Sequence, residues 1–108
     1  MSKIVENLEK LLAAGPETPL LHFGIANAVV NSDPHKAITH LERALVLDEN
    51  YSAAWKLLGK TLTGIDNSRA IEVFEQGIRV ADNNGDVQAG KEMNVFLKRA
   101  RKARDENN

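Results

Sequence analysis

Hydrophobic residues near the start of the chain recur at the three- and four-residue spacing of an amphipathic helix. At 100° per residue, those within residues 3–14 form one stripe about 120° wide, and the charged residues lie outside it. A helix with a single apolar face packs on one side only, so we expect this helix to close one end of a larger stack. The stripe consists of Ile4, Val5, Leu8, Leu11 and Leu12.

The pattern then repeats along the chain with a period of 33 residues. Residues 19–51 align with residues 52–84 without a gap, and residues 3–14 align with the second half of the first unit. Self-similarity at a fixed period is typical of helical repeat arrays. Aligned pairs include His22 with Trp55, Ile25 with Leu58, Ala26 with Gly59, Ala37 with Ala70, Leu41 with Phe74, and Ala44 with Gly77.

Turn signals divide each unit into two helices, here called helix A and helix B. Thr18 and Asp33 each precede a proline, which is the combination of an N-cap with a proline in the first helical turn. Asp66 offers a cap at the matching place in the second unit. Gly15 and Pro16 end the first helix. The expected helices are 3–14, 19–31, 34–47, 52–64, 67–81 and 87–104.

The last expected helix, 87–104, occupies the place of a third helix A. The 33-residue frame puts Glu92 over Gly59, although the apolar side of this helix is formed by other residues. Either the register has slipped within residues 83–86 or the helix has become a cap, and the sequence leaves both open. The apolar side consists of Val87, Met93, Phe96, Leu97 and Ala100.

The second unit resembles the tetratricopeptide repeat, whose pattern is W-x2-L-G-x2-Y followed by A-x3-F. The resemblance covers nearly the whole chain and implies an all-α, right-handed α-solenoid of antiparallel helix pairs with about six helices. The implied domain has a half-repeat or cap helix at 3–14, repeats at 19–51 and 52–84, and a capping helix at 87–104. The resemblance also favours a packing role for Trp55 over ligand stacking. The matching residues are Trp55, Leu58, Gly59, Leu62, Ala70 and Phe74.

The resemblance also implies that the A helices line a concave, partner-binding surface. Lys56 and Lys60 are four residues apart, so they share a helical face and would attract a carboxylate of a partner. The alternative is that both lysines are simply solvated. Chaperone-binding members have a lysine where this chain has Phe23, so that ligand is not implied. The candidate partner-binding residues are Leu20, Phe23, Asn27, Val30, Lys56, Lys60 and Thr63.

A run of cations near the end of the chain is a second candidate surface. It could contact a phosphate backbone or an acidic partner. The alternative is a solvated last turn that is favourably placed against the helix dipole. The run lacks aromatic residues for base stacking, which disfavours a nucleic-acid partner. It consists of Lys98, Arg99, Arg101, Lys102 and Arg104.

Composition excludes several other functions. The formal net charge is −1, although residues 91–108 carry six Lys/Arg against three Asp/Glu. Without cysteine there is no disulfide or thiol chemistry, and the start of the chain does not resemble a signal peptide, so we expect a cytoplasmic protein. No run is long enough to span a membrane. Metal-ligand spacing is absent from His22, His35 and His40.

These observations predict a non-catalytic protein–protein interaction module that binds a peptide or helix in a short concave groove. No paired carboxylates or phosphate-binding loop point to an enzyme, a cofactor or a small-molecule substrate. The expected partner is a protein or peptide, and the lysines of the groove favour an acidic one. The chain itself is expected to be a monomer or weak homo-oligomer. The alternatives are a homo-oligomeric assembly subunit, or contact with an acidic partner or nucleic acid through the basic C-terminal helix.

Overall fold

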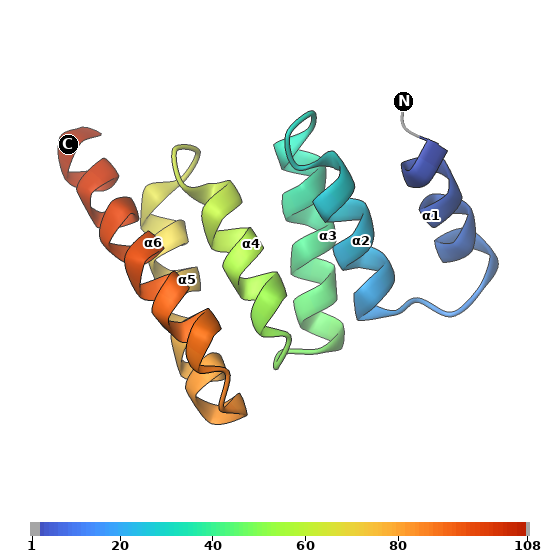
Figure 1. Ribbon diagram of the computed structural model, residues 1–108. Helices are drawn as coiled ribbons and strands as arrows, with labels where there is room; N and C mark the ends of the chain where they lie inside the picture. Colours follow the sequence, from blue (N-terminus) through green and yellow to red (C-terminus); the bar gives the residue numbers. More distant parts are fainter. Residues whose placement is uncertain (1–2, 108) are drawn as a thin grey trace.

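Six α-helices lie side by side in the part of the chain that the structure describes, residues 3–107, and no strand occurs there. The structure is a computed structural model. Successive helices alternate in direction, with α2, α4 and α6 in one row and α3 and α5 behind them (Figure 1). This confirms the predicted all-α fold. The helices are α1 (Lys3–Ala14), α2 (Pro19–Val29), α3 (Pro34–Leu47), α4 (Ser52–Leu62), α5 (Asn67–Asn84) and α6 (Val87–Asn107).

The predicted N-caps are formed as expected. The side chains of Thr18, Asp33 and Asp66 each accept a hydrogen bond of 3.1 Å from the backbone amide three residues further on. Each bond satisfies an amide that the first turn of a helix leaves without an intrahelical acceptor. These caps therefore set where α2, α3 and α5 begin.

Four of the predicted helix ends were wrong by two or three residues. Helices α2 and α4 end at Val29 and Leu62 rather than at 31 and 64, because the carbonyl of each accepts two amides of the following turn at 2.7–3.0 Å. Helix α5 continues to Asn84 rather than 81 and ends where Gly85 adopts a φ of 70°. Helix α6 continues to Asn107 rather than 104.

Small residues bring the two helix rows into close contact. A Cβ atom added to Gly59 of α4 would lie 2.5 Å from Cε1 of Phe74 on α5. A Cβ added to Gly77 of α5 would lie 2.6 Å from Sδ of Met93 and 2.8 Å from Cβ of Trp55. Phe74 and Met93 are completely buried, so glycine is required wherever these side chains cross the neighbouring helix.

Ion pairs recur at one position of the repeat and link α1 to α3, α3 to α5, and α5 to α6. Three glutamates spaced 33 residues apart each bind a cation of a later helix. All three pairs are partly exposed, so each contributes little to stability. The pairs are Glu9–Lys36 at 2.9 Å, Glu42–Arg69, and Glu75–Arg101 at 3.3 Å.

Helix α1 leaves part of its apolar stripe exposed. Val5 is buried, but Ile4 and Leu11 are 65% and 58% exposed. In the 33-residue frame α1 is a helix B, and the matching residues of α3 and α5 are buried beneath the helix A of their own unit. Helix α1 has no such partner within the described residues, and its main contacts there are with α2.

The register of α6 differs from the 33-residue frame. Met93 is buried against α5, whereas Glu92, which that frame aligns with Gly59, is half-buried and binds Lys56. The register has therefore slipped before α6. The outer side of the same helix is polar and exposed, as in a capping helix.

Candidate functional site

Two adjacent hollows follow the row formed by α2, α4 and α6. The first has a volume of about 280 Å³ and includes Val30, Leu57 and Lys60. The second, about 210 Å³, is lined by Lys60, Thr63, Phe96 and Arg99. Because Lys60 lines both, we treat them as one site and call it the front groove.

A ring flanked by two cations forms the centre of the front groove. Nζ of Lys60 lies 5.0 Å from the ring centre of Phe96, and Cζ of Arg99 lies 5.5 Å from it on the same helix as the ring. Lys60 belongs to the predicted partner-binding set and Arg99 to the predicted basic run. Phe96 was predicted only as part of the apolar side of its helix, because the repeat pattern does not show which side chains of two helices meet.

The second predicted groove lysine is already engaged. Nζ of Lys56 lies 3.5 Å from Oε1 of Glu92 on α6, and both side chains are partly exposed. This pair cancels much of the charge that Lys56 would offer a ligand. The cations that face the groove without a carboxylate partner in the described residues are therefore Lys60 and Arg99.

The predicted residues of α2 form the other end of this surface. Leu20 is 70% exposed, and Asn27 is also exposed. The ring of Phe23 stacks on that of Tyr51, with 5.1 Å between the ring centres. Burial, together with the nearby charge of Asp48, raises the pKa of the Tyr51 hydroxyl. Tyr51 gave no signal in the repeat pattern, because it lies between the aligned helices.

The basic run does not form one continuous free patch. Arg101 binds Glu75, Arg104 contacts Asp105 at 3.2 Å, and Arg99 lies over the Phe96 ring. Three members of the run, Lys98, Arg99 and Lys102, are exposed without an ion pair in residues 3–107. A nucleic-acid backbone would therefore find unpaired cations interrupted by paired ones.

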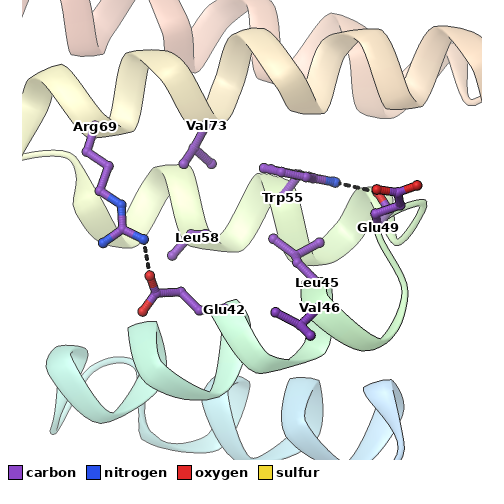
Figure 2. Close-up of a pocket in the computed structure, with 8 residues that line it drawn as sticks. All are labelled: Glu42, Leu45, Val46, Glu49, Trp55, Leu58, Arg69 and Val73. Carbon is purple, nitrogen blue, oxygen red and sulfur yellow. Dashed lines mark hydrogen bonds and ion pairs between the residues drawn. The ribbon is translucent and has the colours of Figure 1, made fainter.

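A third hollow opens on the opposite side of the stack, between α3 and α5, with α4 as its floor (Figure 2). We call it the back groove. Its volume is about 290 Å³, and most of its wall is apolar. The Trp55 indole forms part of the wall, and its Nε1 donates a hydrogen bond of 2.8 Å to the backbone carbonyl of Glu49. The lining residues are Glu42, Leu45, Val46, Glu49, Trp55, Leu58, Arg69 and Val73.

Trp55 is both a packing residue and a wall of the back groove. Its Cβ lies against the backbone of Gly77, as the predicted packing role requires. The ring itself is only half-buried. The repeat pattern does not reveal this groove, because the pattern aligns α3 with α5 but cannot show which side chains fill the space between them.

Two of the three histidines form a hydrogen-bonded chain between α2 and α3. Nδ1 of the buried His22 lies 2.8 Å from Nδ1 of His40, and its Nε2 lies 2.7 Å from Oε1 of Glu17. Hydrogen bonds from Arg43 and then His22 lower the pKa of Glu17 to about 2. Burial, and then the charges of His22 and Lys36, lower the pKa of His40.

Metal binding and membrane crossing find no support in residues 3–107. No three His, Asp or Glu side chains in that range are grouped so that they could hold a metal ion. No described helix is long and apolar enough to cross a bilayer. Every buried side-chain nitrogen or oxygen of the described residues has a hydrogen-bond partner.

The two-row stack and its glycine contacts define a helical-repeat protein of the α-solenoid type, and relatives identify the family. The chain is 43% identical over 103 residues to a TPR repeat-containing protein of Pseudomonas aeruginosa, PA0015, covering 94% of this chain and 98% of the relative. The chain therefore belongs to the tetratricopeptide repeat family, whose members are generally protein-interaction modules. No protein-family model matches the chain.

Solved structures show the same architecture. The solution structure of protein BPP2914 from Bordetella parapertussis is 40% identical with a TM-score of 0.81, covering 94% of this chain and 90% of that one. The crystal structure of MamA, at 20% identity, has a TM-score of 0.65 and covers 95% of this chain and 68% of its own. At that identity the second likeness supports the fold alone.

Proposed function

We propose that the chain is a non-catalytic, cytoplasmic interaction module that binds an acidic peptide or helix of a partner protein in the front groove. The observation that carries the proposal is the position of the Lys60 and Arg99 cations over the Phe96 ring. Charge-assisted hydrogen bonds from lysine or arginine to a carboxylate are among the stronger polar contacts in proteins. The ring supplies apolar contact area beside them.

The wider surface supports binding of an extended segment rather than a single group. The hollow that contains Val30 and Leu57 continues from the cation cluster towards α2. The stacked rings of Phe23 and Tyr51 and the exposed Leu20 lie on that helix and on the turn before α4. A partner with an acidic residue and nearby apolar side chains would fit this order of surfaces.

The test compares two double charge reversals. Wild type, Lys60→Glu/Arg99→Glu and Lys98→Glu/Lys102→Glu would be used as baits in pull-downs from the source organism, with bound proteins identified by mass spectrometry. The second variant is a matched control, because it makes the same change of charge on exposed residues outside the front groove. Affinity would then be measured by fluorescence anisotropy with a peptide from the captured protein.

We expect Lys60→Glu/Arg99→Glu to weaken binding at least about tenfold, because a carboxylate ligand would then face two like charges. The control should bind as wild type does. Loss only in the control would place the function in the basic run instead. Unchanged binding by both variants would contradict the proposal.

A further inference from the structure

The back groove is an apolar site that the proposed function does not use. Its counterpart one repeat earlier, between α1 and α3, is filled by the chain itself. The residues that precede Trp55 and Val73 by 33 are His22 and His40, and their rings meet there with only 2.8 Å between the Nδ1 atoms. The valine at the later position is too short to fill the equivalent space, so the back groove stays open.

The back groove carries a negative charge. Glu42 is paired with Arg69, whereas the carboxylate of Glu49 has no ion pair in residues 3–107. Val46 at the mouth is 72% exposed. An occupant that presents an apolar side chain beside a cation would complement both features.

The outer face of α6 presents an apolar side chain beside cations. Lys91, Val95, Lys98 and Lys102 fall within about 60° of one another at 100° per residue. The three lysines are exposed without an ion pair in the described residues, and Val95 is 49% exposed. We call these four residues the α6 stripe. Its lysine stems extend the apolar surface of Val95 while their charges stay in water.

The stripe cannot reach the back groove of its own molecule. Met93, Leu97 and Ala100 hold the opposite side of α6 against the stack, so the stripe faces away from it. The charge is also unevenly distributed along the chain. Residues 91–108 carry six Lys/Arg and three Asp/Glu, whereas the net charge of the whole chain is −1. A second copy would therefore meet the first through unlike charges.

We propose that the back groove is a docking site for the α6 stripe of a second copy of this chain, with Val95 seated against Trp55 and its flanking lysines near Glu49. The contact joins two different surfaces, so it can form open chains or close into a pair. The Trp55 indole is held in place by its hydrogen bond to the Glu49 carbonyl, so this wall of the groove is already ordered before the second copy arrives.

The test uses two exposed substitutions that each remove one half of the contact. Val46→Glu places a charge in the groove, and Val95→Glu places one in the stripe. Ile65→Glu is the matched control, since Ile65 is an exposed apolar residue (46%) in the turn between α4 and α5. Circular dichroism would verify that all three variants fold. Sedimentation equilibrium from micromolar to millimolar protein would then give their average masses.

We expect the mass of wild type and of Ile65→Glu to rise with concentration, less so at high salt. Val46→Glu and Val95→Glu should each stay monomeric, whereas an equimolar mixture should form a one-to-one pair, because each variant retains the half that the other lacks. A wild type that stays monomeric at millimolar concentration, or a mixture that forms no pair, would overturn the proposal.

Fluorescence identifies the surface. Trp55 is the single tryptophan of the chain. The Val95→Glu copy would be titrated with a copy that carries Val46→Glu and Trp55→Phe and therefore has no indole. A saturable change in emission is expected, and its absence despite pair formation would show that another surface is used. Lys60→Glu/Arg99→Glu should associate as wild type does, so failure of this proposal is separable from failure of the front groove.

Discussion

Replacing Gly59 with alanine should destabilise the protein even though glycine is a poor helix former. The new Cβ would lie 2.5, 2.6 and 2.7 Å from Cε1, Cζ and Cδ1 of the Phe74 ring. Ordinary contact begins near 3.4 Å, so the ring would have to move by about 0.9 Å. Phe74 is completely buried and has no space in which to move.

The magnitude follows from two opposing terms. Alanine in a helix interior is about 1 kcal/mol more favourable than glycine. Overpacking a well-filled core costs about 1–3 kcal/mol, and contact with three atoms of a rigid, buried ring corresponds to the upper end of that range. We therefore expect Gly59→Ala to lower the free energy of unfolding by about 2 kcal/mol.

The assay is urea unfolding followed by circular dichroism, with the free energy extrapolated to water. Gly90→Ala is the control, because this glycine is also buried within a helix but its nearest new contact is 3.8 Å away. The control should gain about 1 kcal/mol. A second substitution, Phe74→Leu, removes the ring atoms and should reduce the cost of Gly59→Ala by at least about 1 kcal/mol. A Gly59→Ala variant as stable as wild type would refute the reasoning.

Three further predictions concern the core, the histidine pair and the ion pairs. Phe74→Ala should cost about 3–5 kcal/mol in the same urea assay, and a loss below about 2 would show that the core collapses around the cavity. Folding lowers the pKa of His40 from 6.5, so as the pH falls the unfolded chain is protonated before the folded protein. The melting temperature should therefore fall as the pH drops below 6.5. His40→Gln should flatten this pH dependence, whereas an unchanged slope would assign it to other groups. Glu42→Gln breaks the half-exposed pair with Arg69 and should change the free energy of unfolding by less than about 1 kcal/mol, measured by urea unfolding; a larger loss would mean that the pair is coupled to the packing of α3 and α5 on α4.

Local signals in the sequence were sufficient for most of the fold. The caps at Thr18, Asp33 and Asp66 act within one helical turn, so they could be recognised without knowledge of the packing. The 33-residue period aligned Gly59 and Gly77 with alanines one unit earlier, which marked them as close-approach positions. The C-terminal ends of the helices were harder to predict. Helix α5 runs three residues past its predicted end before Gly85 stops it, and the repeat pattern does not mark this extension.

The front groove could be predicted only in part, because its centre is formed by contacts between different helices. The structure places Phe96 and Arg99 beside Lys60, and Glu92 beside Lys56. Neither contact is encoded by spacing within a single helix, since both partners lie more than 30 residues away from the lysines.

The space between α1 and α3 and the space between α3 and α5 show how one scaffold produces two different surfaces. We call these spaces the first and second intervals. The ion pairs Glu9–Lys36 and Glu42–Arg69 occupy the same repeat position, so equivalent side chains link α1 to α3 and α3 to α5. The other side chains between these helices differ.

In the first interval, His22 and His40 hydrogen-bond to each other and close the space. In the second, Trp55 and Val73 share no hydrogen bond, and the indole instead donates to the backbone carbonyl of Glu49. The same chain fills the equivalent space with His22 and His40. An open, apolar surface in the second interval is therefore more consistent with a contact site than with a packing defect. Replacing Val73 with histidine tests this reasoning. If a longer side chain is all that the groove lacks, Val73→His should reduce self-association while leaving the free energy of unfolding within about 1 kcal/mol of wild type.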